Sequence, residues 1–509
     1  MIRALCNITR LVAIARTLAR HDALEALEVL GVAPALVWIM RRRRRPAPEA
    51  DGRLGVRLAA AAVALGPSFI KLGQALSTRA DLLGPQVAED LGRLRDAVPP
   101  FPAAEARARV ARELGAPVDD LFKGFDDAPI AAASIAQVHF ATTSDDREVA
   151  VKILRPGIEQ AFARDIDLLL WIAQLIERTQ PKWRRLRPVE SVRAFAELVA
   201  IEMDLRLEGA AASELAENFR DDGSYAVPAV DWPRTGQRVL TTARVEGIPI
   251  HRRDDLIAAG HDPDAILATS ARAMFNQIFR DGFFHGDPHP GNLFVAPDGT
   301  VTVVDFGIMG RLDRQSRLYI AELLLGFLTG DYARAAEVHF RAGFVPRDKS
   351  LGAFTQACRS IAEPILERPA NEISIGRLLG QLFQITETFG MRTQPHLLLL
   401  QKVMVVAEGV GRDLSPEANM WLLARPLIED WVRDNLGPQA RLRDSLANFA
   451  DAAHRLPRIL AGAEGLLEQV SEQFSGAPAR AARPPVWRDA VLVAAGAAII
   501  AILATAMML

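Results

Sequence analysis

Cysteine is almost absent from this sequence. Only Cys6 and Cys358 occur among 509 residues, which excludes a disulfide framework and argues against a zinc site built from cysteines. An excess of one charge is also lacking, because the net charge is −2 and half of the residues are hydrophobic. This balance excludes a disordered chain and a bulk nucleic-acid-binding protein. We therefore expect a globular protein of two or more domains in a reducing compartment, without a nucleic-acid partner.

A cleavable signal peptide is not expected, because no compact apolar core followed by a small-residue cleavage site occurs at the N-terminus. Residues 490–509, AVLVAAGAAIIAILATAMML, hold no charge, and a helix of this length spans a ~30 Å hydrocarbon layer. Arg480, Arg483 and Arg488 precede the segment, which by the positive-inside rule keeps the body of the protein in the cytoplasm. We predict a single C-terminal transmembrane helix, with a helix buried in the fold as the alternative.

The N-terminal 45 residues are basic and amphipathic. Apolar residues recur at helical spacing between residues 2 and 18 with arginines among them, and five further arginines follow at 41–45. This pattern is typical of a membrane-surface helix with a polybasic patch. It is equally typical of a packed helix followed by a solvated linker. The sequence leaves both interpretations open.

The middle of the chain changes from helical to β-type patterns and back. Residues 55–125 are predicted to be helical, and two β-rich runs, IAQVHFATT and REVAVKIL, then form a hairpin across SDD. Residues 158–219 and 262–281 are again helical, with a strand in RVLTTARVEGIPI between them, and helices dominate beyond residue 312. This order predicts a two-lobed α+β enzyme with helical additions.

The stretch FFHGDPHPGNLFVAPDGTVTVVDFG, residues 283–307, concentrates the candidate chemistry. NLFVAP and TVTVVDF are two short strands joined by an Asp-Gly turn, a strong hairpin signal. The hairpin brings Asp287 and Asn292, which precede it, close to Asp305, which follows it. Carboxylate and amide oxygens of this kind suit Mg²⁺ bound to nucleotide phosphates. The D-x-x-x-x-N spacing and the D-F-G sequence at 305–307 match the motifs of a kinase catalytic site.

A zinc hydrolase is an alternative for the same stretch. His285, Asp287 and His289 form an H-x-D-x-H cluster of suitable ligand types. Pro288 and Pro290 exclude a regular helix, so the i,i+4 face that would aim both imidazoles at one ion is not available. A loop site stays open, although no third ligand cluster with suitable spacing is found nearby.

Kinase-type chemistry also needs a cation on a strand and a carboxylate that holds it. Lys152 ends the run Val-Ala-Val-Lys in the predicted hairpin and fits the V-A-I-K pattern, although a strand lysine can equally face solvent. The helical stretch AELVAIEMDLRLEGA offers three carboxylates, Glu202, Asp204 and Glu208. Asp204 and Glu208 are four residues apart, a like-charge pair on one helix face that requires a cation nearby.

The glycine-rich loop of kinases, G-x-G-x-x-G, is missing before Lys152. The corresponding turn is alanine-rich, and alanine allows less backbone freedom and less close approach than glycine. We expect phosphates to be held differently, with a serine hydroxyl as donor. The candidate nucleotide-binding residues of this turn are Ala131, Ala132, Ala133, Ser134, Ile135, Ala136, Gln137 and Val138.

Two further kinase features are absent. Gly286 stands where protein kinases carry an arginine that binds a phosphorylated activation loop, and no A-P-E segment follows Asp305. Activation by phosphorylation is therefore not expected.

Taken together, these motifs resemble the UbiB family of atypical, kinase-like proteins linked to ubiquinone biosynthesis. The resemblance runs from about residue 60 to 425 and includes LLLLQKVMVVAEGVGRDLSP at 397–416, which is similar to the family's helical C-terminal signature. The other hallmarks, in chain order, are Lys71-Leu72-Gly73-Gln74 (K-x-G-Q), the turn Ala131 to Ser134, Lys152, Glu202-Met203-Asp204 (E-x-D), His285 to Asn292 and Asp305-Phe306-Gly307.

The resemblance implies ATP and Mg²⁺ as ligands and a role for each motif. Lys152 would contact the phosphates and pair with Glu208, Asp287 would be the catalytic-loop acid, and Asn292 and Asp305 would hold Mg²⁺. A regulatory helix is implied as well, in which Lys71 and Gln74 lie over the cleft and face Glu202 and Asp204. An occupied cleft argues against ordinary Ser/Thr kinase activity and favours ATP hydrolysis or action on a small lipid-like substrate.

The fold class expected from this resemblance is α+β, a two-lobed kinase-like fold with a helical N-terminal extension and a C-terminal transmembrane helix. The family's bacterial members often have two C-terminal spans, whereas this sequence shows one. The predicted parts are basic N-terminal helices at 1–45, the K-x-G-Q extension at 55–125, an N-lobe at 126–246, a helical C-lobe at 247–435, a helix and linker at 436–488 and a transmembrane helix at 489–509.

We therefore expect a membrane-tethered atypical kinase or ATPase that supports ubiquinone biosynthesis at the bacterial inner membrane, with its catalytic body in the cytoplasm. Its expected partners are a membrane lipid or quinone precursor and other ubiquinone-biosynthesis enzymes, and a homodimer is left open. A pseudokinase that uses nucleotide only to change shape, as a scaffold for those enzymes, is the main alternative. The sequence holds no flavin fingerprint and no iron facial triad, so a direct oxygenase role is not expected.

Overall fold

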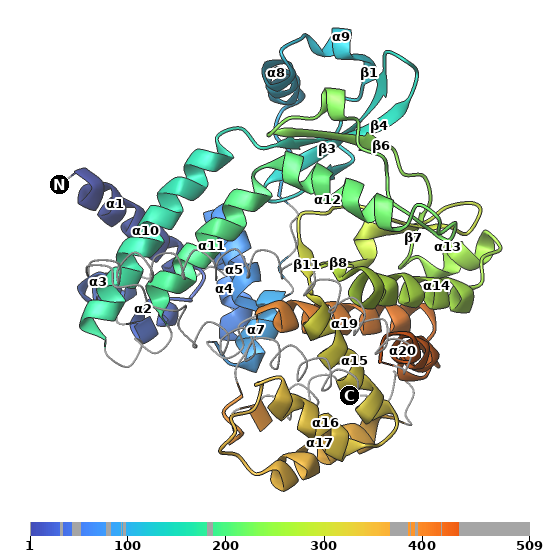
Figure 1. Cartoon of the computed structure of the whole chain (residues 1–509). Helices are drawn as coiled ribbons and strands as arrows, with labels where there is room; N and C mark the ends of the chain where they lie inside the picture. The colour runs from blue at the N-terminus through green and yellow to red at the C-terminus, as the bar shows by residue number, and fades with distance from the viewer. Residues whose placement is uncertain are drawn as a thin grey trace, which may run out of the picture. The chain divides into compact units, whose positions relative to one another are not determined.

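The structure is a computed structural model of the chain (Figure 1). It describes residues 2–30, 34–42, 52–77, 83–92, 94, 98–180, 187–366, 385–386, 388–391, 395–418 and 420–436. Two compact units are distinguished, Met1–Leu427 and Ile428–Leu509. The predicted transmembrane helix at 489–509 and, beyond Leu436, the predicted linker lie outside the described residues. None of the helices within the described ranges has both the length and the apolar character needed to cross a bilayer.

The N-terminal helices pack against one long helix, α10 (Ile158–Thr179). The apolar stripe predicted for residues 2–18 lies on α1, where Leu11 and Leu18 are buried in a cluster that includes Leu168 of α10. Arg10 adds two hydrogen bonds to the buried carboxylate of Asp165, at 2.7 and 3.0 Å. The packed-helix interpretation is therefore correct for this stripe. The N-terminal helices are α1 (Ile2–Arg20), α2 (Glu25–Leu30), α3 (Pro34–Arg42), α4 (Leu54–Leu65), α5 (Pro67–Ser77) and α7 (Pro85–Gly92).

The predicted hairpin across residues 144–146 forms the centre of a five-stranded antiparallel sheet, the N-lobe sheet. Side chains alternate between the faces of a strand, so Val149, Val151 and Ile153 enter a core shared with α8 while Lys152 lies on the other face. The strands are β1 (Phe122–Phe125), β2 (Ala131–Ala132), β3 (Ala136–Thr143), β4 (Glu148–Leu154) and β6 (Val239–Ala243), with α8 (Ala103–Leu114), α9 (Val118–Leu121) and the 3₁₀ turn η2 (Trp232–Arg234) beside them.

The helical region predicted at 158–219 is interrupted twice. After α10 the chain forms α11 (Pro188–Glu202) and α12 (Leu205–Asn218), with a break at Met203 and Asp204. Asp204 is the N-cap of α12, and its carboxylate accepts hydrogen bonds from the backbone and guanidinium of Arg206 at 2.6–3.2 Å. The prediction that Asp204 and Glu208 form a like-charge pair on one continuous helix is therefore wrong, because a cap with its own cation separates them.

The C-lobe contains two small sheets and the helices around them (Figure 1). The predicted Asp-Gly hairpin is present, with Val301 opposite Val295 and Gly299 at a φ of 86°. The pairing of β8 with β11, which places His285 opposite Met309, was not predicted. The strands are β5 (Tyr225–Ala226), β7 (Ile248–Pro249), β8 (Phe283–His285), β9 (Leu293–Val295), β10 (Val301–Val303) and β11 (Met309–Arg311).

The C-lobe core is formed mainly by apolar side chains of β9, β10, α14 and α12, and α19 adds Val410 and Leu414. Because α12 buries Leu215 here while Glu208 points to Lys152, this helix connects the two lobes. The helical elements are α13 (Arg253–Ala258), α14 (Pro263–Phe275), the π-helical turn η3 (Asn276–Asp281), the 3₁₀ turn η4 (Pro290–Asn292), α15 (Arg314–Leu328), α16 (Tyr332–Arg341), α17 (Leu351–Leu366), α19 (Pro395–Leu414) and α20 (Met420–Leu436).

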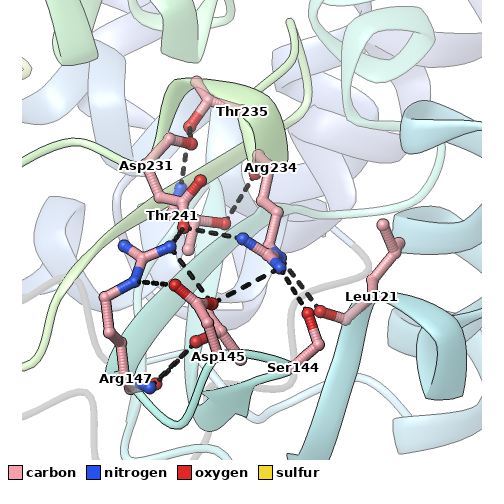
Figure 2. Close-up of polar contacts among 9 residues, drawn as sticks. Leu121, Ser144, Asp145, Arg147, Asp231, Arg234, Thr235 and Thr241 are labelled. Atoms are coloured by element: carbon pink, nitrogen blue, oxygen red, sulfur yellow. Dashed lines mark hydrogen bonds and ion pairs between the residues drawn. The ribbon is translucent and has the colours of Figure 1, made fainter.

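A buried aspartate holds together the far end of the N-lobe sheet (Figure 2). Asp231 is 5% exposed, and its carboxylate accepts from Arg147 at 2.8 Å and from Arg234 at 3.0 Å. Arg234 also donates to the Leu121 carbonyl at 2.9 Å and to the hydroxyl of Ser144 at 2.9 Å. The Asp231 carboxylate thus joins the β3–β4 turn to η2, and the guanidinium of Arg234 connects η2 to the end of α9.

Replacing Asp231 with alanine is expected to lower the free energy of unfolding by about 3 kcal/mol, because two guanidinium groups lose the buried carboxylate between them. Chemical denaturation of the detergent-solubilised protein measures this loss. Asp145→Ala is the control. The exposed Asp145 carboxylate pairs with the same two arginines, Arg147 at 2.6 Å and Arg234 at 3.7 Å, and little change is expected because it is 55% exposed. Equal losses in both variants would contradict the central position of Asp231.

Candidate active site

Lys152 contacts two other predicted site residues, Glu208 and Asp305. Its ammonium nitrogen lies 2.6 Å from Glu208 Oε1 and 2.9 Å from Asp305 Oδ1. The lysine comes from β4, the glutamate from α12, and the aspartate follows β10. The side chains of Lys152 and Glu208 are 17% and 7% exposed, whereas that of Asp305 is 51% exposed. The ammonium group of Lys152 on the N-lobe sheet therefore pairs with the buried carboxylate of Glu208. It also pairs with the solvent-accessible carboxylate of Asp305 from the C-lobe.

The two carboxylates share one ammonium group, and their pKa values diverge. Lys152 holds the pKa of Asp305 well below its usual range, and the charge of Lys71 adds to this effect. Burial raises the pKa of Glu208 to about 7, against the opposing effect of Lys152. Burial also disfavours the charged form of Lys152, but the two carboxylates outweigh it and raise the pKa of the lysine. Asp305 is therefore the carboxylate that carries a negative charge toward solvent.

The backbone of Asp305 is held in an uncommon conformation. Its φ is 65°, in the left-handed region that non-glycine residues rarely adopt. The carbonyl of Asp305 accepts a hydrogen bond from His285 Nε2 at 2.7 Å, which ties this residue to the catalytic-loop segment. Such conformations persist where the surroundings fix them, and they concentrate at functional sites.

His285 fixes the loop and is not free to bind a metal. Its Nε2 donates to Asp305, and its Nδ1 accepts from the backbone N–H of Asp287 at 3.1 Å. Burial lowers the pKa of His285, which favours the neutral ring that these two bonds require. Both ring nitrogens are engaged, so the H-x-D-x-H zinc interpretation loses one of its ligands. In the part of the chain that the structure describes, no group of three or more His, Cys, Asp or Glu side chains is arranged to hold a metal ion.

Asp287 and Asn292 lie together in the segment between β8 and β9. Asn292 Nδ2 donates to the Asp287 carbonyl at 3.2 Å, which leaves its amide oxygen for other contacts. With the Asp305 carboxylate, this oxygen gives a hard donor set that fits Mg²⁺. The Asp287 carboxylate lies 2.9 Å from Lys402 Nζ. Lys402 was not predicted as a site residue, although a lone lysine in the apolar run LLLLQKVMVV was a visible signal.

The alanine-rich turn lies above the site as a short strand, a bend and the start of β3. Ala131 and Ala132 pair with Val138 and Gln137. The side chain of Ser134 is fully buried, and among the described residues its hydroxyl has no hydrogen-bond partner. Because this side chain is not exposed, the contact of the Ser134 hydroxyl with a phosphate stays a prediction.

Gln137 differs from the other predicted members of this turn. Its side-chain amide bonds to both the backbone N–H and the carbonyl of Phe101, at 3.0 and 3.3 Å, and lies 2.8 Å from His139 Nε2. The side chain is buried on the far side of the strand. The side chain of Gln137 is therefore engaged by Phe101 and His139, and a contact of this residue with a nucleotide stays a prediction.

The K-x-G-Q residues lie on α5, next to the end of α11. Lys71 Nζ is 2.9 Å from Glu202 Oε2, and both side chains are largely buried, at 15% and 6% exposure. Gln74 donates to the Leu94 carbonyl at 3.4 Å. The structure therefore brings Lys71 and Glu202 together as predicted, while the carboxylate of Asp204 binds Arg206.

The coupling between Lys152 and Glu208 can be measured by a double-mutant cycle. Glu208→Gln is expected to cost less stability in a Lys152→Met background than in the wild type, because without the ammonium the buried Glu208 carboxylate faces the negative charge of Asp305. The expected coupling energy is about 1–3 kcal/mol, from chemical denaturation. The exposed pair Lys123–Asp146 is the control cycle and should show almost none. A comparable value for both pairs would contradict the assignment.

The fold and the site define an atypical kinase-like protein, and comparisons with known proteins agree. A family profile described as the ABC1 atypical kinase-like domain matches residues 93–339, and one described as the UbiB helical domain matches residues 358–419. The protein Rv3197 from Mycobacterium tuberculosis, solved in complex with erythromycin, has a TM-score of 0.51 and 26% sequence identity. That similarity covers 70% of this chain and 91% of Rv3197.

Curated relatives extend the match over most of the chain. The "Probable protein kinase UbiB" of Marinobacter nauticus is 40% identical over 420 residues, which cover 81% of this chain and 77% of the relative. That of Xanthomonas campestris pv. campestris is 41% identical over 474 residues, covering 89% and 84%. The chain belongs to the UbiB family of atypical kinase-like proteins.

Proposed function

We propose that this protein binds Mg-ATP between its lobes and uses it, by hydrolysis or by transfer to a small lipid-like acceptor, to support ubiquinone biosynthesis at the bacterial inner membrane. The observation that carries the proposal is the contact of Lys152 with both Glu208 and Asp305. It brings a strand lysine within a nucleotide's reach of the D-F-G aspartate, as kinase-type phosphoryl transfer requires. The link to ubiquinone rests on membership of the UbiB family, to which these relatives also belong by name.

Each residue has a separate task in this proposal. Lys152 binds the phosphates. When they are present, its ammonium group leaves Asp305 and contacts the phosphate oxygens, while Glu208 keeps the lysine in place. Asn292 and Asp305 would hold Mg²⁺, which bridges the phosphates and neutralises their charge when bound. Asp287 orients the acceptor oxygen and takes its proton. The hydroxyl of Ser134, which has no hydrogen-bond partner in the described part of the chain, would supply a donor to the phosphates from the N-lobe.

The position of α5 supports a substrate other than a protein side chain. Its Lys71 is fixed to Glu202 by an ion pair with little solvent exposure, so α5 is firmly placed beside the site. The family resemblance implies that the K-x-G-Q helix lies over the cleft where a protein substrate would dock. Water, or a small acceptor that reaches the site from the membrane, fits this arrangement better.

Asp305→Asn is expected to lower phosphate release from Mg-ATP at least about 100-fold, because a charged metal ligand is lost. The assay uses the full chain in detergent, with and without a quinone-precursor lipid. Asp298→Asn in the exposed β9–β10 turn is the matched control and should behave like the wild type, since Asn-Gly also suits this turn. Release at the wild-type rate by Asp305→Asn would contradict the metal assignment.

The same proteins separate the alternatives. Nucleotide binding without phosphate release by the wild type would favour a pseudokinase scaffold. Bound zinc in elemental analysis, with activity that needs no nucleotide, would favour the metal-dependent hydrolase. Quinone profiling of cells that lack the protein should show a loss of ubiquinone that the wild-type gene restores and the Asp305→Asn gene does not. A normal quinone profile in those cells would contradict the proposed pathway.

The membrane tether in this proposal rests on the uncharged run at 490–509 and the arginines before it. Deletion of residues 489–509 is expected to move the protein from the membrane fraction to the soluble fraction after cell lysis. The control replaces the segment with an unrelated single-span helix, which should restore membrane attachment. A truncated protein that stays fully membrane-bound would show that another surface carries the attachment.

A further inference from the structure

The C-lobe helix α19 places a lysine directly at the catalytic-loop aspartate. Lys402 Nζ lies 2.9 Å from Asp287 Oδ1, and the two side chains are 34% and 38% exposed. The pair is therefore accessible to a ligand and is not part of the buried core. A surface ion pair of this kind contributes little to stability, so stability alone does not account for it.

Apolar packing against the C-lobe fixes the position of α19. Leu400, Val403 and Val410 are each less than 9% exposed and anchor the helix in the C-lobe. One turn before the lysine, Leu399 reaches the loop itself. A Cβ at Gly286 would lie 3.2 Å from Leu399 Cδ1 and 3.0 Å from the Ile308 carbonyl oxygen. The glycine beside Asp287 thus lets α19 approach closely.

Leu399 and Lys402 are three residues apart and so lie on the same side of α19. The contact of Leu399 beside Gly286 and the ion pair of Lys402 with Asp287 are therefore both made by the same face of α19. A side chain on a packed helix is held more precisely than one on a loop, which is what a group acting on a reacting centre needs.

The chemistry of the loop gives this lysine a task. The ion pair places a positive charge beside the Asp287 carboxylate. In phosphoryl transfer the transition state carries negative charge on the equatorial oxygens of the moving group. Lys152 brings positive charge from the N-lobe, and Lys402 would bring it from the C-lobe, next to the residue that holds the acceptor.

We propose that Lys402 is a catalytic residue that binds the transferred phosphoryl group at Asp287; this inference rests on the proposed function. The acceptor oxygen forms a bond to the γ-phosphorus, and the bond from that phosphorus to the β,γ-bridging oxygen breaks, with its electron pair leaving on ADP. The proton of the acceptor passes to Asp287. Lys402 stays protonated throughout and turns from Asp287 to the oxygens of the transferred group.

The test compares Lys402→Met and Lys402→Arg with Lys123→Met, the same change at a lysine that is 65% exposed on β1. Lys402→Met should lower kcat for phosphate release about 100-fold. It should weaken binding of a non-hydrolysable Mg-ATP analogue several-fold and leave Mg-ADP binding unchanged, because ADP lacks the group that Lys402 holds. Lys402→Arg should recover most of both losses, and Lys123→Met should match the wild type.

Other results would overturn the inference. An unchanged kcat in Lys402→Met, or equal losses of analogue and ADP affinity, would make Lys402 a structural tether for the loop. Thermal unfolding of each variant shows whether a lost activity reflects lost fold, and failure of Lys402→Arg to recover in a folded protein would also count against the role. A wild-type protein that binds no Mg-nucleotide would instead refute the proposed function itself. Nucleotide binding by the wild type therefore distinguishes failure of the proposed function from failure of the role of Lys402.

Discussion

One ammonium group shared by two carboxylates is the interaction on which the site depends. Lys152 lies on the N-lobe sheet, Glu208 on the helix that connects the lobes, and Asp305 at the end of a C-lobe hairpin. No single element could place these three groups together. Sheet register fixes the face of the lysine, the helix break at Asp204 sets the start of α12, and the backbone of Asp305 turns its carboxylate toward the lysine. The two lobes are therefore in contact here through ion pairs of Lys152, and the apolar cores of each lobe keep the three side chains in place.

Several features follow directly from local sequence. The β3–β4 hairpin and the Asp-Gly hairpin were predictable because alternating apolar residues and turn residues encode them over a few positions. The same alternation did not decide whether Lys152 faces the site or solvent, and the structure shows its contact with Glu208 and Asp305. The pairing of Lys152 with Glu208 and of Lys71 with Glu202 joins residues far apart in the chain, and it was expected only from the family resemblance.

Other features could not be predicted from the sequence because tertiary contacts decide them. The break between α11 and α12 depends on a cap whose side chain could equally have lain on a helix surface. Gln137 looked like part of a phosphate turn, but its amide serves the backbone of Phe101. Lys402 is more than a hundred residues from Asp287, and only the packing of α19 shows that they meet. The same holds for the strand pair β8–β11, which is too short to be recognised by pattern.

The attachment of α5 has a consequence for how a ligand reaches the site. Leu72 and Ala75 pack into the apolar cluster formed by β3, α10, α11 and β6, and Lys71 is bound to α11. This helix is therefore packed against the N-lobe. If the site binds a nucleotide as proposed, any opening between the lobes would move α5 together with the N-lobe sheet, and not as a separate flap.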